Sequence, residues 1–282
     1  MTKHASYLIE GTDGRKIPVD IHLPAVGNDR VPVIIFLHGF KGFKDWGTFP
    51  MICELMSRSG FAVARFNFSW NGTRPDNPME FCEPAQFGHN TFSRELDDLD
   101  LVIENLWWTI SMQSRIDPAR LGLLGHSRGG GTAILKAAQD PRVKAVATWA
   151  AVSDFEKRVN PPELEEWKRK GVADVVNART GQVLPMYIDI RDDFYANKEK
   201  LDIQTNAKTL QIPQLIVHGT NDEAVPLREA EALKIWNPFA EFVELHGANH
   251  TLGGKHPWEE KSLPDDTMKA VVATTTFFRQ NL

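Results

Sequence analysis

The chain has 282 residues, of which 42% are hydrophobic and 24% are charged, as in globular proteins large enough to bury a sizeable core. Its formal net charge of −5 lacks the basic excess that nucleic-acid or anionic-membrane binding needs, so neither partner is expected. No apolar stretch reaches the roughly 20 residues of a spanning helix, and the first residues lack the apolar core of a secretory signal. Cys53 and Cys82 favour free thiols in a reducing compartment, which predicts a cytoplasmic protein.

Apolar runs of strand length alternate with segments of helix length along most of the chain. The strand pair at 7–24 contains Asp13 and Gly14, which favour a hairpin turn. The later apolar runs are continuous, as in strands buried on both faces of a parallel sheet. Further strands are predicted at 31–40, 61–70, 120–127, 143–151, 213–222 and 240–250, and helices at 45–60, 90–108, 128–140, 226–236 and 266–280. This order predicts a mostly parallel eight-stranded α/β sheet with helices on both faces.

The alternation stops between residues 152 and 210. This segment contains a predicted charged helix, a hairpin and a second helix, at 161–171, 172–188 and 191–202. It is too small to hold a core of its own, and long insertions in compact domains are usually lids or binding elements. We therefore expect a core formed by 1–151 and 211–282, and a lid or cap insertion at 152–210.

One strand-to-helix turn carries the most specific motif of the sequence. The letters GHSRG at 125–129 match G-x-S-x-G, with a predicted strand before them and a predicted helix after them. A serine on such a turn has a strained backbone and an exposed hydroxyl, and its flanking glycines avoid collisions with neighbouring elements. The N-terminus of the following helix favours developing negative charge. Ser127 is therefore the predicted nucleophile.

A nucleophilic serine needs a base, and the base needs an acid that orients it. His250 follows the last predicted strand, and Asp222 follows the strand before it. All three side chains would lie at the carboxyl ends of parallel strands, where α/β sheets form their binding crevice. The predicted triad is Ser127, Asp222 and His250, and Asp154, which follows an earlier strand, is the alternative acid.

Three other histidines have expected structural roles. His38 and His218 each precede a glycine at a strand end, where they are expected to hold loops by hydrogen bonds. His126, beside the nucleophile, is expected to pack. The remaining histidines show no metal-ligand spacing, so no metal is expected.

Four short motifs resemble those of one superfamily. They are HGF at 38–40, GHSRGG at 125–130, HGTND at 218–222 and GANH at 247–250. Nearly the whole chain resembles serine esterases of the α/β-hydrolase superfamily, in particular bacterial cinnamoyl (feruloyl) esterases and dienelactone-hydrolase-like proteins. The resemblance implies an α/β-hydrolase fold with a lid insertion, and an oxyanion hole made by the backbone N–H groups of Phe40 and Arg128.

The motifs predict a serine hydrolase that cleaves small carboxylic esters through an acyl-enzyme without a cofactor. The resemblance suggests aryl (hydroxycinnamoyl) esters as substrates. Amidase, peptidase or acyltransferase chemistry on the same triad and a non-catalytic binding protein of the same fold are the alternatives. A homodimer stays open.

Apolar and aromatic side chains from two segments are expected to lie above Ser127. If they face the cleft, they form a flat apolar slot for an aromatic or short acyl group, and packing beneath the lid is the alternative. The predicted substrate-binding residues are Trp70, Trp167, Met186, Tyr187 and Phe194.

Overall fold

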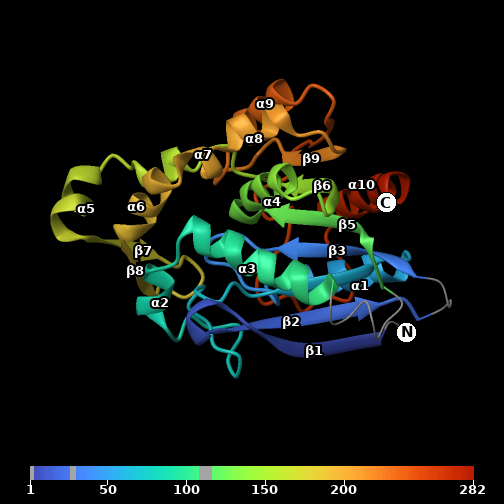
Figure 1. Cartoon of the computed structure of the whole chain (residues 1–282), viewed down its shortest axis with the longest axis horizontal. Coiled ribbons are helices and arrows are strands. Elements are labelled where there is room, and N and C mark those ends of the chain that lie inside the picture. Colours follow the sequence, from blue (N-terminus) through green and yellow to red (C-terminus); the bar gives the residue numbers. More distant parts are fainter. Residues whose placement is uncertain (1–2, 26–29, 108–115) are drawn as a thin grey trace.

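The computed structural model describes residues 3–25, 30–107 and 116–282. Its centre is an eight-stranded sheet with the strand order β1-β2-β4-β3-β5-β6-β9-β10 (Figure 1). The β1–β2 and β2–β4 pairs are antiparallel and the other pairs are parallel, which confirms the predicted sheet. The strands are β1 (Lys3–Glu10), β2 (Lys16–Leu23), β3 (Val31–Leu37), β4 (Ala62–Phe66), β5 (Ile116–His126), β6 (Val143–Trp149), β9 (Gln214–Gly219) and β10 (Glu241–Leu245).

The continuous apolar runs form strands that are buried on both faces. In β3, Val33, Ile35 and Leu37 pack into one hydrophobic cluster, whereas Ile34 and Phe36 pack into the cluster on the opposite face. Helices α3 and α4 contribute to the first cluster, and α1 and α10 contribute to the second (Figure 1). The helices around the sheet are α1 (Phe49–Arg58), α2 (Pro84–Gly88), α3 (Phe92–Asn105), α4 (Arg128–Gln139), α9 (Leu227–Trp236) and α10 (Asp265–Asn281).

Local signals in the sequence explain several element boundaries. Asp13 and Gly14 both have positive φ angles, 57° and 72°, as a hairpin turn of the predicted kind requires. The Thr91 hydroxyl accepts a hydrogen bond from the backbone N–H of Arg94 at 3.4 Å, and it thereby caps the start of α3. Trp108, the last residue of the helix predicted at 90–108, lies outside the described residues.

The 152–210 segment has more helices than the sequence pattern predicts. Its elements are a 3-10 turn (Glu156–Val159), α5 (Leu164–Lys170), β7 (Val172–Val176), β8 (Val183–Tyr187), α6 (Asp189–Ala196), α7 (Lys198–Leu201) and α8 (Ile203–Thr209). The predicted hairpin is the antiparallel β7–β8 pair, but the predicted second helix is divided into α6 and α7, and α8 was not predicted. In Figure 1, α5, α6 and the β7–β8 hairpin lie beyond one end of the sheet.

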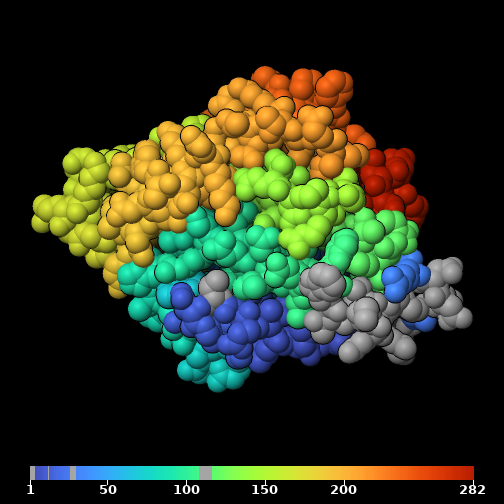
Figure 2. Space-filling view, in the orientation of Figure 1, coloured from blue at the N-terminus to red at the C-terminus, as the bar shows by residue number. Residues whose placement is uncertain are grey.

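This segment contributes no strand to the eight-stranded sheet, yet it shares a core with the rest of the chain. Trp167, Phe194 and Ile203 pack in the same cluster as Phe92 of α3 and Ile134 of α4. Its surface continues into that of residues 80–100 in the space-filling view (Figure 2). The 152–210 segment is therefore packed on the sheet layer and does not form a separate core.

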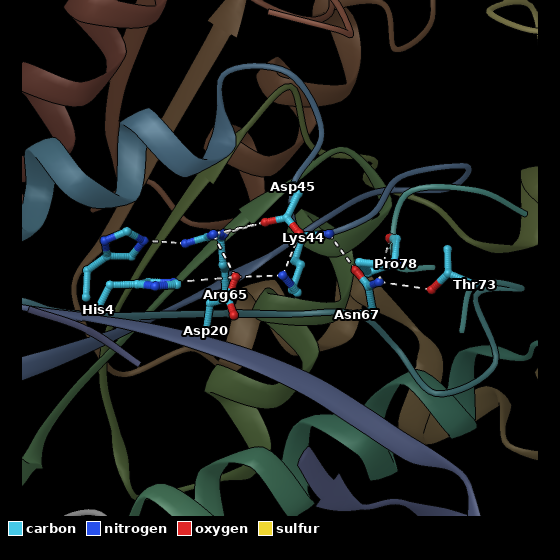
Figure 3. A network of polar contacts seen from close by, with 9 residues as sticks. His4, Asp20, Lys44, Asp45, Arg65, Asn67, Thr73 and Pro78 are labelled. Carbon is cyan, nitrogen blue, oxygen red and sulfur yellow. Dashed lines mark hydrogen bonds and ion pairs between the residues drawn. The ribbon is translucent and has the colours of Figure 1, made fainter. Parts of the chain in front are cut away.

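A buried ionic network joins the antiparallel end of the sheet to the loop after β3 (Figure 3). We call Asp20, Lys44, Asp45 and Arg65 the Asp20 network. The Lys44 ammonium lies 2.6 Å from an Asp20 oxygen and 2.5 Å from an Asp45 oxygen. The Arg65 guanidinium, from β4, lies 2.7 Å from Asp20 and 2.9 Å from Asp45. Every charge in the network therefore has two partners of opposite sign.

The loop after β3 has a second attachment close to this network. The backbone N–H of Lys44 donates to Asn67 Oδ1 at 2.5 Å, and the Asn67 amide donates to Thr73 Oγ1 and to the Pro78 carbonyl (Figure 3). The loop is thus held from β2, from β4 and from the chain beyond β4. It carries Phe40, one of the two residues expected to form the oxyanion hole.

Candidate active site

The turn between β5 and α4 holds Ser127 in a strained conformation. Its φ and ψ angles are 56° and −120°, which non-glycine residues rarely adopt. The strain is held by hydrogen bonds, since the Ser127 N–H donates to the Trp149 carbonyl at 2.9 Å and the Ser127 carbonyl accepts from Val152 at 3.2 Å. The serine side chain is partly exposed at the N-terminus of α4. The turn thus projects a hydroxyl group out of the backbone.

The glycines of the motif are required by close backbone contacts. A Cβ atom on Gly125 would lie 2.2 Å from the Gly129 carbonyl oxygen, and one on Gly129 would lie 2.5 Å from the His38 carbonyl oxygen. Gly39 also approaches the nucleophile, because a Cβ there would lie 2.8 Å from the Cβ of Ser127. No larger residue fits at these positions unless the backbone moves.

Asp222 and His250 form the hydrogen bond expected of an acid and a base. His250 Nδ1 lies 2.8 Å from Asp222 Oδ2, and the other Asp222 oxygen accepts from the N–H groups of Ala224 at 2.9 Å and Val225 at 2.8 Å. Burial opposes ionisation of Asp222, but these hydrogen bonds and the His250 charge outweigh it and lower the pKa of the carboxyl group. Asp222 is thereby kept as a carboxylate.

The loops after β9 and β10 are tied to each other beside this pair. The N–H groups of Thr220 and Asn221 donate to the carbonyls of Leu245 and Ala248, at 3.1 and 3.0 Å. Gly219 fits closely here, because a Cβ would lie 2.2 Å from the Ala248 carbonyl oxygen. The two loops therefore hold their catalytic candidates in one frame.

The other histidines near the site are buried and bonded to the backbone. His38 Nδ1 lies 2.9 Å from the Gly39 carbonyl oxygen, His218 Nε2 lies 2.7 Å from that of Val225, and His126 Nε2 lies 2.9 Å from that of His250. Burial lowers the pKa of His38 to about 4 and that of His126 to about 3, so both are neutral at pH 7. His126 thus helps to position the backbone of the base.

Phe40 and Arg128, the residues expected to form the oxyanion hole, both lie beside Ser127. Arg128 is the first residue of α4, where backbone N–H groups have no acceptor within the helix. Phe40 follows Gly39, which is in close contact with Ser127. The Arg128 guanidinium lies 4.1 Å from the centre of the Phe40 ring and 3.2 Å from the Glu95 carboxylate. The Arg128 side chain therefore packs on the Phe40 ring and is held there by its ion pair with Glu95.

Two cavities meet at this site. One has a volume of about 310 Å³ and the other of about 390 Å³. Both are lined by Phe40, Lys41, Ser127 and His250. The smaller cavity is also lined by Gly39, Gly42, Trp46, Phe49, His126, Asn177, Ala178, Arg179 and Thr251, and the larger by Arg128, Val152, Phe155, Arg158, Met186, Ala224 and Val225.

Of the five residues expected to bind substrate, all of them described, Met186 alone lines a cavity at Ser127. Trp167 and Phe194 are buried in the core shared with α3 and α4. Trp70 is packed between two guanidinium groups, at 4.2 and 4.1 Å, and Tyr187 stacks on the His89 ring with 4.0 Å between their centres. These four side chains therefore hold the surrounding segments together.

Several lining residues had no signal in the sequence. Trp46 and Phe49 supply an aromatic wall from the loop after β3 and the start of α1, and Arg158 and Arg179 come from the 152–210 segment. The alternative acid, Asp154, is 3.6 Å from Lys157 and accepts from its backbone N–H. Within residues 3–25, 30–107 and 116–282, no three His, Cys, Asp or Glu side chains gather as metal ligands would.

A serine on a strand–turn–helix motif, followed in the chain by an acid and a histidine after later strands, defines the α/β-hydrolase fold. The structure is similar to that of Est1E from Butyrivibrio proteoclasticus with ferulic acid bound, at a TM-score of 0.72 and 18% identity over 98% of this chain and 99% of that one. The family model described as "Putative esterase" matches residues 11–260, so the chain belongs to this esterase family. The predicted superfamily is thereby confirmed.

Curated relatives match parts of the chain. An uncharacterized 31.7 kDa Escherichia coli protein encoded between traX and finO is 31% identical over 151 residues, or 54% of this chain and 48% of that protein. The 2,6-dihydropseudooxynicotine hydrolase of Paenarthrobacter nicotinovorans is 25% identical over 217 residues, or 76% and 50%. The chain thus spans about half the length of these relatives. In the part of the chain that the structure describes, no helix is long and apolar enough to cross a membrane.

Proposed function

We propose that the protein is a serine hydrolase that cleaves small carboxylic esters through an acyl-enzyme. The 2.8 Å hydrogen bond between His250 Nδ1 and Asp222 carries this proposal. It commits Nδ1 to the acid and leaves Nε2 for Ser127, which lines the same two cavities as His250. Hydrogen bonds between catalytic groups often form only when substrate binds, so the contact between Ser127 Oγ and His250 Nε2 is expected in the substrate complex.

The proposed reaction has two steps. Ser127 Oγ attacks the acyl carbon while His250 takes the hydroxyl proton, and the N–H groups of Phe40 and Arg128 stabilise the oxyanion. His250 then gives the proton to the leaving alcohol as the ester C–O bond breaks. Water, activated by the same histidine, hydrolyses the acyl-enzyme and restores Ser127. Asp222 stabilises the imidazolium in both steps and needs no cofactor to do so.

The dimensions of the cavities support small substrates with one flat group. The cavity of about 310 Å³ has Trp46 and Phe49 in its wall, with 5.4 Å between their ring centres, and can hold an aryl group. Hydroxycinnamoyl esters are therefore the proposed substrate class. A cytoplasmic location and function without nucleic-acid or membrane partners are part of the same proposal.

A fluorophosphonate probe and an ester panel test this function. The wild type should react covalently with the probe, and Ser127→Ala should not react and should lose about 10⁶-fold in kcat, because the alanine retains the turn but not the nucleophile. Among methyl ferulate, 4-nitrophenyl butyrate and 4-nitrophenyl palmitate, kcat/KM should be lowest for palmitate.

Circular dichroism of Ser127→Ala is the folding control. Substantial turnover by this variant would refute the serine mechanism, and palmitate as the best substrate would refute the small-ester assignment. Butyrate hydrolysis without ferulate hydrolysis would remove the aryl preference. Cleavage of matched amides faster than esters, or acyl transfer to added alcohols in place of hydrolysis, would favour the amidase or acyltransferase alternatives.

A further inference from the structure

Four of the described residues line both cavities, and Lys41 is the one of them that has no role in the proposed reaction. Phe40, Ser127 and His250, which also line both cavities, have proposed roles in the chemistry. Lys41 comes directly after the oxyanion-hole residue Phe40. Lys41 therefore borders the region where a bound ester would lie.

The charge of the cavity walls is opposite to that of the chain as a whole. Lys41, Arg128 and Arg158 line the larger cavity, and Lys41 and Arg179 line the smaller one. No Asp or Glu is among the described residues that line either cavity, although the chain has a formal net charge of −5. A cleft with one sign of charge attracts substrate groups of the opposite sign.

The three arginines are already neutralised by carboxylates outside the cavities. Arg128 lies 3.2 Å from Glu95, Arg158 lies 2.6 Å from Glu229, and Arg179 lies 3.8 Å from Glu80. Arg158 lines the larger cavity, but its Nε atom is closed to solvent, so Arg158 contributes positive charge to the wall and not a free donor.

Lys41 differs from these arginines. Its ammonium group donates to the Val176 carbonyl at 3.1 Å, and it forms no ion pair with any described residue. Burial lowers the pKa of Lys41 with no neighbouring carboxylate to oppose the shift. An anion beside the ammonium group would compensate for its partial loss of solvent.

The backbone fixes Lys41 at this place. Its φ angle is 58°, in the left-handed region that non-glycine residues rarely adopt. The Gly42 N–H donates to the Gly39 carbonyl at 3.0 Å across the turn, and the Asp20 network holds the same loop three residues further on. A strained lysine held between two cavities is typical of a residue with a functional role.

We propose that Lys41 binds a carboxylate group carried by the ester substrate. The proposal rests on the proposed hydrolase function and specifies its substrate class: esters with one negative charge a few atoms from the bond that is cleaved. The carboxylate would lie in the larger cavity, accept from the Lys41 ammonium, and supply the missing counter-ion.

Two matched ester pairs test this proposal and show which part of the ester carries the charge. In the acyl arm, 4-nitrophenyl hexanoate is compared with the 4-nitrophenyl monoester of adipic acid, which ends in a carboxylate. In the leaving-group arm, 4-methylphenyl acetate is compared with 4-acetoxybenzoate. The wild type should favour the carboxylate in one arm by about 10- to 100-fold in kcat/KM, after subtraction of the uncatalysed rate. Added salt should reduce this ratio.

Variants of Lys41 connect the preference to its charge. Lys41→Met should lower the ratio of kcat/KM values about 10-fold or more, and Lys41→Arg should restore most of it, because the charge returns. Lys144→Met is the matched control, since Lys144 is exposed and bonded to the Pro141 carbonyl, and its ratio should equal that of the wild type. Thermal unfolding of each variant would identify a loss caused by misfolding.

The outcomes separate this proposal from the proposed function. A wild type that hydrolyses both neutral esters without preferring the carboxylate in either arm would overturn the carboxylate assignment and leave the hydrolase intact. A full preference in Lys41→Met would overturn the role of Lys41. Absence of both probe labelling and ester cleavage would overturn the proposed function, and the assignment of the substrate class with it.

Discussion

The turn around Ser127 and the 152–210 segment border the same cavities, but different forces hold them in place. Backbone contacts determine the turn, where a Cβ on Gly125 would lie 2.2 Å from a carbonyl oxygen. Side-chain packing determines the segment, because its Phe155 ring stacks on the Phe92 ring of α3 with 4.0 Å between their centres and its Trp167 is buried. The turn allows almost no change of residue type, whereas the segment can be repacked.

This difference suggests separate roles for the two regions, one in bond cleavage and the other in substrate recognition. The proposed nucleophile, acid and base are on turns after parallel strands, which would keep the geometry that bond cleavage requires. The segment supplies Met186, Arg158 and Arg179 to the cavity walls, where we propose that the shape and charge of the substrate are recognised. Changes in the turn should therefore alter kcat and stability, and changes in the segment should mainly alter which ester is preferred.

Replacement of each candidate acid by asparagine should give the largest difference in kcat/KM between the two regions. Asp222→Asn should lower kcat/KM by about 10⁴-fold, because the amide cannot orient the His250 imidazole or stabilise its charge. Asp154→Asn, at the start of the 152–210 segment, should change it less than about 10-fold, since Asp154 contacts Lys157. Ester hydrolysis under single-substrate steady-state conditions measures both. A larger loss for Asp154→Asn would move the acid to that residue.

Two glycine-to-alanine substitutions compare how strongly the backbone is constrained in the Ser127 turn and in the 152–210 segment. Gly125→Ala should lower the free energy of unfolding by about 3 kcal/mol or more, because the added methyl group overlaps the Gly129 carbonyl. Gly181→Ala, in the β7–β8 hairpin, should cost about 1 kcal/mol, since its φ is 72° and no atom lies within 4 Å of the added Cβ. Urea unfolding with equal m-values gives both numbers. Equal losses would show that the turn is no more constrained than the hairpin.

Acid should destabilise the protein through buried histidines of the sheet region, because the 152–210 segment contains no histidine. Burial lowers the pKa of His38 to about 4 and that of His126 to about 3, from about 6.5 in the unfolded chain. Between these values the unfolded chain binds more protons than the folded chain. Stability is therefore fully present above about pH 6.5 and falls as the pH decreases, by up to about 1.4 kcal/mol per pH unit for each histidine.

Urea unfolding at pH 4.5, 5.5 and 6.5 measures this slope. His38→Asn should reduce the slope by about 1 kcal/mol per pH unit relative to the wild type. A variant with an unchanged slope would show that His38 is not held neutral by its surroundings.

The sequence predicts the parts of the molecule in which local rules and the fold agree. Continuous apolar runs predict the mostly parallel sheet, the Asp13-Gly14 turn predicts its N-terminal hairpin, and the flanking glycines identify the turn of Ser127. The order of serine, acid and histidine along the chain placed Asp222 and His250 together, 2.8 Å apart in the structure. Each of these inferences depends on residues close in sequence or on a topological rule.

The cavity walls could not be predicted in the same way. Trp167 and Phe194 belong to the same segment as Met186, yet they are buried in the core and only Met186 lines a cavity at Ser127. The direction of each side chain depends on long-range packing of several short helices, for which the sequence has no periodic signal. Lys41 could not be predicted from the sequence either, because its positive φ and its lack of a counter-ion are properties of the folded chain.

The Asp20 network has a consequence for exchanging modules between related enzymes. One of its two acids, Asp20, comes from the N-terminal hairpin, whereas Lys44 and the other acid, Asp45, are in the loop that bears Phe40 and Lys41. A chimaera that takes the hairpin from a homologue without the matching loop would leave Lys44 or Arg65 buried beside an incomplete set of acids, which is strongly destabilising. The hairpin and the loop must therefore be transplanted together, and a library that shuffles this fold should place its crossovers outside both.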